Sequence, residues 1–251
     1  MRSAALWLTL GVLSGPLAMS QSQPAHAPDG GTRAMITSIV VSPLPDAPFT
    51  ATVNTEWTRI LENGATQIFA NHRLIARDGQ GRVFQERRFL VPPRDDKPTS
   101  RLTSTEIADP LTHTIAFCSP DGRMCELRLY VVPPRPALLP AGTSPNGTGS
   151  LVREDLGAQT VNGIEMIGTR DITTADGAVV GTDRPLQIIK EFWYSPRLGL
   201  NLSTKRMDPR NGVELFTLTD IRQSEPDPNL FALPKNARIV DYRTPATPPR
   251  H

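Results

Sequence analysis

Histidine and carboxylate side chains are the groups best able to move protons or bind metal ions in this chain. The four histidines lie far apart in the sequence, at His26, His72, His113 and His251. A histidine-based metal site would need His72 and His113 to converge with a carboxylate, and their spacing gives no sign of this. No Gly-x-Ser-x-Gly, phosphate-binding glycine loop or His-Glu-x-x-His pattern occurs. The sequence therefore predicts a protein that is not an enzyme, with no catalytic residue, no metal site and no cofactor.

Two carboxylate arrangements are candidates for acid and base groups. Glu154 and Asp155 are adjacent, so in a strand they point to opposite faces and make a poor acid/base pair. Glu191 and Trp193 share a face if their strand is regular, and a carboxylate beside an indole can have a raised pKa or orient a polar ligand. We prefer the interpretation that Glu191 pairs with an arginine such as Arg170.

The two cysteines, Cys118 and Cys125, are the only ones in the chain. An even pair in an exported protein indicates a disulfide. The turn-forming residues 119–122 lie between them, so the bond would join neighbouring strands of a hairpin. Its short loop removes little entropy from the unfolded chain, and we expect it to contribute less than about 3 kcal/mol. A redox or metal role is the weaker interpretation, because no second cysteine pair or nearby histidine pair exists.

Strand patterns are strongest in residues 186–234. Side chains alternate across an extended segment at 188–195 and place an aromatic residue, Phe192 or Trp193, on each face. Pro196 ends that strand because proline lacks the N–H needed for the ladder. Leucines at 198, 200 and 202 then follow with a period of two, which predicts another half-buried strand.

The end of this stretch is organised by turns. Residues 208–212, with the pair Asn211-Gly212, predict a hairpin, because this pair adopts positive φ readily. The same residues lack the alternating acidic ligands and distal glutamate of a calcium loop. A strand follows at 213–221. Asp227 is placed to cap a single helical turn that begins at Pro228 and presses Leu230 and Phe231 onto the sheet.

The first half of the chain predicts a meander of three antiparallel strands at 49–60, 66–77 and 82–91, joined by tight turns. Residues 102–110 are ambiguous and are compatible with a short helix. Five arginines occur in the meander, at Arg73, Arg77, Arg82, Arg87 and Arg88. We interpret them as the solvated side of the sheet, in preference to a basic face for phosphate headgroups or an anionic polymer.

Composition and patterning bound the organisation of the 251 residues. Residues 1–20 predict a signal peptide, with cleavage before Gln21 or at a second site after Ala27, so the protein is expected to be exported to the periplasm or outside the cell. Residues 21–33 are expected to be disordered, as is the tail at 243–251. Between them, 34–242 predict a single β-rich domain interrupted by a proline- and glycine-rich loop at 133–150. No later segment is apolar for long enough to span a membrane, and the net charge of +2 does not favour nucleic acid.

The chain resembles an uncharacterised family of secreted, β-rich bacterial proteins. The motifs that carry the resemblance are Glu154–Gly157, Asn162–Ile164, Gly168–Arg170, Glu191–Ser195, Asp208–Arg210, Glu225–Phe231 and the meander at 51–88. More distantly, the order of these segments is similar to the end of periplasmic lipoprotein-carrier and related lipid-binding half-barrel proteins. That similarity implies an antiparallel sheet curled around an apolar cavity, and the family implies no catalytic residues. The chain departs from the group in having no long N-terminal amphipathic helix and no clear lid helix.

These observations predict a mostly β protein with a large curved antiparallel sheet, half-barrel-like, and one or two short helices. Its expected function is to bind an apolar ligand, a lipid or a lipidated protein on the curved sheet. The candidate lining residues are Trp57, Phe192, Trp193, Leu200, Leu215 and Phe216. The alternative is an envelope module for protein interaction or sensing that has no ligand cavity. A hydrolase is a distant third, and it would require Glu191 to converge with His72 or His113.

Overall fold

A computed structural model describes residues 39–93, 100–132, 139–144 and 146–243. The predicted signal peptide, the segment at 21–33 and the tail beyond Arg243 lie outside the described residues, as does part of the predicted loop at 133–150.

The described residues form one curved, open sheet of 13 strands with very little helix. The elements in chain order are β1 (Phe49–Ile60), β2 (Thr66–Arg77), β3 (Val83–Arg88), β4 (Leu102–Asp109), β5 (Thr114–Cys118), β6 (Met124–Leu129), β7 (Gly142–Thr143), β8 (Gly149–Val161), β9 (Ile164–Ala175), α1 (Gly177–Val180), β10 (Leu186–Ser195), β11 (Leu200–Asp208), β12 (Gly212–Arg222), the 3-10 turn η1 (Pro228–Phe231) and β13 (Arg238–Asp241). The predicted fold class is confirmed.

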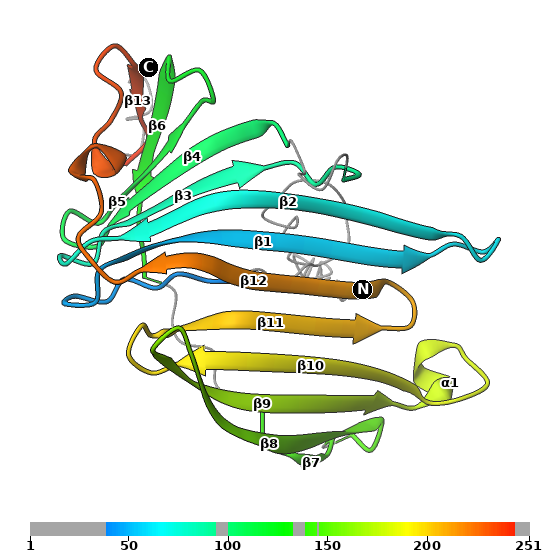
Figure 1. Cartoon of the computed structure of the whole chain (residues 1–251). Helices are drawn as coiled ribbons and strands as arrows, with labels where there is room; N and C mark the ends of the chain where they lie inside the picture. The colour runs from blue at the N-terminus through cyan, green and yellow to red at the C-terminus, as the bar shows by residue number, and fades with distance from the viewer. Residues whose placement is uncertain (1–38, 94–99, 133–138, 145, 244–251) are drawn as a thin grey trace, which may run out of the picture.

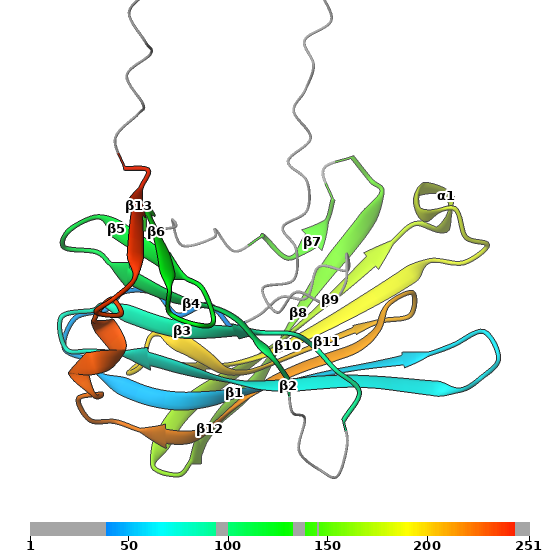
Figure 2. The same cartoon turned by 90° about the horizontal axis from the view of Figure 1, so that it is seen from above.

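The chain enters the sheet in its middle and returns there. From β1 the strands run outward to β6; the chain then resumes at the opposite edge with β7 and returns through successive hairpins to β12, which pairs with β1. The C-terminal β13 pairs with β6 in parallel, and every other pairing between named strands is antiparallel (Figure 1). Figure 2 shows that the two ends of the sheet, at β13 and β7, rise on the same side of the central strands.

The sheet has an inner face, which carries Phe49, Val53 and Trp57 of β1, and an outer face on the opposite side. These three side chains are between 0% and 2% exposed, as the alternation in 49–57 predicts. Phe49 and Val53 belong to the main buried region, where apolar residues of β11 and β12 join them: Leu200, Leu202, Phe216 and Leu218. Ile39 and Val41 pack here as well.

A second buried cluster lies on the outer face of β2 to β6. Five apolar side chains follow one another across the neighbouring strands: Ala76, Phe84, Ile107, Ala116 and Leu127. The turn η1 covers this row, with Phe231 only 7% exposed and Leu230 packed beside it. Asp227 caps the turn by accepting a hydrogen bond from the Asn229 backbone N–H. The predicted capped turn is confirmed.

The cysteine hairpin forms as the sequence predicts. Cys118 of β5 and Cys125 of β6 are directly opposite in register and are joined by a disulfide of 2.01 Å. The preceding segment differs from the expectation of a short helix, because residues 102–109 form β4. This strand pairs with β3 on one side and β5 on the other, which satisfies its backbone groups along both edges.

The interpretation of the arginines as a solvated side is wrong for two of them. Arg73 is 1% exposed and Arg77 is fully buried on the inner face. The guanidinium of Arg77 donates hydrogen bonds to the carbonyl oxygens of Ser42, Ala47 and Leu198 at 2.7–3.0 Å. Burial lowers the pKa of Arg77 to about 10. Arg77 therefore connects β2 to the segment that precedes β1 and to the β10–β11 turn.

Candidate ligand-binding site

The six predicted lining residues do not gather on one surface. Trp57 and Phe216 are on the inner face, 2% and 1% exposed, and are part of the packed sheet. Phe192 is on the same face, because it is opposite Thr204, which is in turn opposite Phe216.

Of the remaining three predicted residues, two lie on the outer face and Leu200 lies in the main buried region. Leu215 is on the outer face, since it is opposite Glu56 of β1. Trp193 is also on the outer face, where its ring lies against Gly168 of β9, so closely that a Cβ on that glycine would meet the ring at 2.6 Å. Leu200 is buried at the start of β11. Alternation predicts opposite faces for Phe192 and Trp193, and the structure distributes the six candidate residues over both faces of the sheet.

The outer face of the other half of the sheet carries a row of apolar side chains. Strand registers place the members directly opposite one another, from β8 through β12: Val152, Ile172, Ile189, Met207 and Val213. The row crosses five strands and is roughly 19 Å long, because neighbouring strands lie about 4.8 Å apart. Val152 is 51% exposed and the other four are half-buried.

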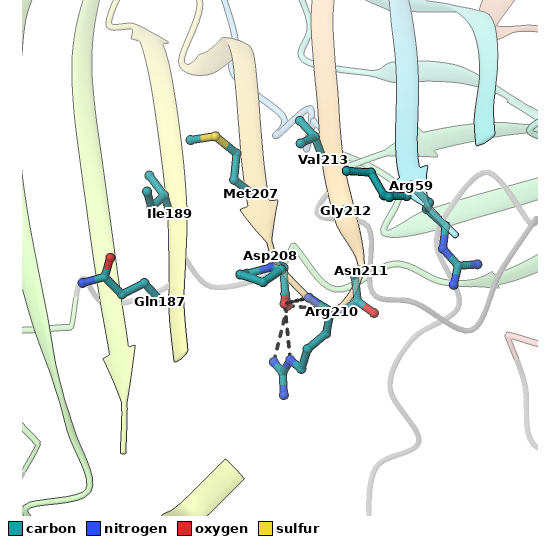
Figure 3. Close-up of a pocket in the computed structure, with 11 residues that line it drawn as sticks. Arg59, Gln187, Ile189, Met207, Asp208, Arg210, Asn211, Gly212 and Val213 are labelled. Carbon is teal, nitrogen blue, oxygen red and sulfur yellow. Dashed lines mark hydrogen bonds and ion pairs between the residues drawn. The ribbon is translucent and has the colours of Figure 1, made fainter. Parts of the chain in front are cut away.

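A groove of about 410 Å³ lies over one end of this apolar row (Figure 3). Ile189, Met207 and Val213 form its floor, and Ile60 at the end of β1 contributes a further apolar side chain. Its polar groups gather at the strand ends: Arg59, Gln187, Asp208, Arg210 and Asn211. The groove therefore has an apolar floor and one polar end. A second pocket, of about 250 Å³, has a more polar lining that includes Asn54, Glu56 and His72.

The polar end is built around the carboxylate of Asp208. This residue is 2% exposed and accepts hydrogen bonds from Arg206 at 2.8 Å, Asn211 at 3.2 Å and the Arg210 backbone N–H at 3.0 Å. Burial alone would raise the pKa of Asp208, but the hydrogen bonds and charge of Arg210, with the charge of Arg206, lower it below its usual value. Asp208 thus stays ionised and fixes the β11–β12 turn.

A row of charged side chains borders the apolar row on the side away from the turn. Glu154, Arg170, Glu191 and Lys205 are successively opposite one another in β8, β9, β10 and β11. Arg170 donates to Glu191 at 2.9 Å and to Glu154 at 3.0 Å, and these hydrogen bonds raise the pKa of Arg170. The predicted pairing of Glu191 with Arg170 is confirmed, so Glu191 is engaged in a salt bridge.

The histidines considered for chemistry lie apart. His72 is on the outer face of β2 and lies 3.2 Å from the Asn54 side-chain oxygen. His113 is in the turn before β5 with a φ of 50°. Among the described residues, no group of three or more histidine, cysteine, aspartate or glutamate side chains is arranged to hold a metal ion. Within the same residues, no helix is long and apolar enough to cross a membrane.

Sequence reasoning missed the floor of the groove. Alternation does place Ile189 on the face of Glu191 and Trp193, and that signal was available. Met207 and Val213, however, join Ile189 only through the registers of β10 with β11 and of β11 with β12. A shift of one residue in either register would move one of these side chains to the other face.

No protein-family model matches the chain, and no curated protein matches it. Solved structures match at low similarity. A LolA-superfamily protein from Nitrosomonas europaea is 10% identical with a TM-score of 0.29, over 75% of this chain and 91% of that one. The Pseudomonas aeruginosa MucA/MucB complex is 13% identical with a TM-score of 0.36, over 80% and 62%. LprF from Mycobacterium bovis is 13% identical with a TM-score of 0.27, over 72% and 90%.

A LolA-superfamily protein is among these matches, and the sequence is distantly similar to proteins of that lipoprotein-carrier type. At such TM-scores the matches carry no argument about what this chain binds. The groove and the two apolar rows of the outer face are the features that indicate a binding site.

Proposed function

We propose that this chain is an exported binding protein that holds an apolar chain, such as the acyl chain of a lipid or of a lipidated protein, in the groove over Ile189, Met207 and Val213. The observation that carries the proposal is the difference between the two apolar rows of the outer face. The row on β2 to β6 is covered by η1, whereas the row on β8 to β12 remains partly exposed and lies under a 410 Å³ groove.

The dimensions of the groove support an acyl chain as occupant. Its volume is within the range of small-molecule sites, which are mostly apolar clefts of about 300–1,000 Å³. The apolar row continues from the groove floor through Ile172 to Val152, so its shape is long and narrow. Covering such a row is favourable by roughly 25 cal/mol for each Å² of apolar surface removed from water. The paired strands beneath it form the floor before a ligand arrives.

Binding of palmitate to the protein purified without detergent from a periplasmic extract tests the proposal. Met207→Gln and Val213→Thr keep the size of each side chain and add polar atoms to the floor, and we expect each to weaken palmitate binding about tenfold, a loss of about 1.4 kcal/mol. Met124→Gln and Val161→Thr are the matched controls, because Met124 is 41% and Val161 46% exposed outside the groove. The controls should bind as the wild type does.

Native mass spectrometry of the same preparation gives a second readout. We expect a mature protein that begins at Gln21 or Pro28, together with an adduct that organic extraction removes. A mass without adduct before and after incubation with envelope lipids, combined with no palmitate binding, would reject the proposal.

The alternative, an envelope interaction module, is favoured by one observation on β8. The short β7 pairs only with Ser150 and Leu151, although β8 extends to Val161. An exposed strand edge can accept a strand from another protein. This alternative predicts that amides in 154–161 become protected from hydrogen exchange when an envelope protein fraction is added. Unchanged exchange would eliminate it.

A further inference from the structure

We infer that the second pocket of the outer face, over β12, β1 and β2, binds a primary ammonium group carried on a short aliphatic stem. The pocket has a volume of about 250 Å³. It is separate from the groove over Ile189, Met207 and Val213, so the inference goes beyond the proposed function and does not depend on it.

Strand pairing brings the side chains of the pocket together on one face of the sheet. The registers of β1 with β12 and with β2 set them in two adjacent rows. The first row consists of Thr217, Asn54 and His72, and the second of Leu215, Glu56 and Ala70. Because positions two apart along a strand share a face, both rows belong to the outer face. The pocket thus offers polar groups from three neighbouring strands.

A chain of hydrogen bonds fixes the imidazole of His72. The Thr219 hydroxyl donates to the Asp220 carboxylate at 3.3 Å, and its oxygen accepts from the Asn54 side-chain N–H at 2.9 Å. The side-chain oxygen of Asn54 therefore faces His72, whose Nδ1 lies 3.2 Å away and must be the donor. In the neutral ring this arrangement leaves Nε2 as a hydrogen-bond acceptor.

Glu56 supplies a negative charge that no described cation neutralises. The residues opposite it on the two neighbouring strands, Ala70 and Leu215, are apolar. Lys205 follows Leu215 in the same row, so two strand spacings, about 10 Å, separate it from Glu56. Among the described residues no salt bridge joins the two. One Glu56 oxygen accepts a long hydrogen bond of 3.4 Å from Thr58, and the carboxylate is available to a cationic ligand.

The composition of the pocket selects the class of ligand. Its described lining contains one carboxylate and no lysine or arginine, so an anion finds no charged partner there. A primary ammonium has three N–H donors. The pocket offers three acceptors, one from each strand: the carboxylate of Glu56, Nε2 of His72 and the hydroxyl oxygen of Thr217. Ile68, which is 39% exposed, and Leu215 line the same pocket and give the stem of the amine an apolar surface.

An NMR titration of the folded protein with pentylamine tests the inference. Three comparison ligands keep the five-carbon stem: 1-pentanol has no charge, pentyltrimethylammonium has the charge without N–H donors, and pentanoate has the opposite charge. We expect pentylamine to bind at least about tenfold more tightly than each of them, and added salt to weaken its binding. Equal binding of pentylamine and any comparison ligand, or no binding of pentylamine, overturns the inference.

The imidazole of His72 gives a readout at the site itself. Long-range ¹H–¹⁵N spectra at pH 8 distinguish the two ring nitrogens. We expect a proton on Nδ1 and none on Nε2 before ligand is added, and we expect the Nε2 resonance to move as pentylamine binds. If that resonance does not respond to bound pentylamine, the ammonium lies elsewhere and the inference is overturned.

Substitutions on two strands locate the site. Glu56→Gln removes the charge of an exposed side chain and keeps its shape, and it should weaken pentylamine binding at least about tenfold. Thr217→Val removes an acceptor and keeps the branched shape, and it should weaken binding about threefold. Glu165→Gln, at an exposed position of β9 outside the pocket, is the matched control and should bind as the wild type does. Wild-type affinity in Glu56→Gln overturns the inference.

The source of the ammonium is distinguished by a second probe, Nα-acetyl-lysine amide. Tighter binding of pentylamine indicates a free aliphatic amine as the ligand, and tighter binding of the lysine derivative indicates a lysine side chain; both results support an ammonium site.

A groove variant separates this inference from the proposed function. Met207→Gln should leave pentylamine binding unchanged, because Met207 does not line this pocket. A loss of binding in that variant would place the amine in the groove and overturn the inference. Palmitate binding is measured independently, so the proposed function stands if the ammonium site fails.

Discussion

Asp208 and Glu214 are buried carboxylates on neighbouring strands that share Arg206, yet their environments differ. Asp208 accepts hydrogen bonds from three residues, whereas Glu214 is 1% exposed and receives one long hydrogen bond from Arg206 at 3.4 Å. Its second oxygen has no hydrogen-bond partner. Burial raises the pKa of Glu214, while the pKa of Asp208 is lowered. Asp208 therefore has several donors that favour its charged form, whereas burial with one long hydrogen bond disfavours the charged form of Glu214.

These opposite shifts predict opposite pH dependence for Glu214→Gln and Asp208→Asn. The pKa of Glu214 is raised in the folded protein above its unfolded value of 4.5. It therefore contributes stability below pH 4.5, and this contribution is lost as the pH rises through the pKa of the folded state. The wild type should accordingly lose stability relative to Glu214→Gln from pH 4 to pH 8. The lowered pKa of Asp208 gives stability that is present above 3.8 and is lost as pH falls through the folded value.

Urea unfolding at several pH values measures both differences. Asp208→Asn should cost about 3 kcal/mol at pH 7, because Arg206 loses its closest charged partner, and the cost should shrink below pH 4. If the difference in unfolding free energy between the wild type and each variant does not change with pH, or changes in the reverse direction, the directions of the two pKa shifts are wrong.

At the scale of elements, the β11–β12 hairpin positions the polar end of the groove, and Gly212 controls its geometry. This glycine begins β12 with a φ of 90°, and a Cβ there would collide with the carbonyl oxygen of Thr58 in β1. The hairpin can therefore lie beside Arg59 only if residue 212 has no side chain. The neighbouring hairpin between β1 and β2 also contains a glycine of positive φ, Gly64, but nothing lies within 4 Å of its Cβ position.

The two glycines provide a matched pair of variants. Gly64→Ala should cost about 1–2 kcal/mol, from the positive φ alone. Gly212→Ala should cost at least about 1 kcal/mol more, because backbone atoms of β1 must move, and it should weaken palmitate binding while Gly64→Ala does not. Chemical denaturation and calorimetry measure the two effects. Equal costs would show that the contact with Thr58 is unimportant.

At the scale of the whole molecule, the sheet joins the two halves of the chain through β1 and β12. Eight register pairs connect these strands, from Thr50 opposite Arg222 to Thr58 opposite Val213. The C-terminal β13 then crosses to the far edge and pairs with β6. Neither half has the sheet's central pairing by itself, so we expect residues 34–242 to unfold as one unit.

Single-tryptophan variants test this unity. Trp57 reports on β1 and Trp193 on β10, which lies three strands from β1 in the sheet order. We expect both fluorescence signals and far-ultraviolet circular dichroism to change at one urea concentration. Two transitions, with the tryptophans separated between them, would indicate that the loop at 133–150 divides two domains.

Local patterns were sufficient for many elements. The alternation of apolar and polar residues predicted β1 at 49–60 and β2 at 66–77 with the observed bounds, and proline, glycine and aspartate marked the hairpins and the cap of η1. These features depend on neighbours within a few residues. Local patterns did not predict the strand at 102–109, because β4 is stabilised by pairing with strands on both sides.

What the sequence by itself determined is the β architecture, the disulfide and the pairing of Glu191 with Arg170. Only the tertiary structure decided that Arg77 is buried, since its acceptors at Ser42 and Leu198 are remote in the chain. It also decided the groove, because Ile189, Met207 and Val213 become neighbours through strand register. Alternation assigns a side chain to a face, but which strands adjoin and how they are aligned depends on long-range pairing, and that pairing brings the binding residues together.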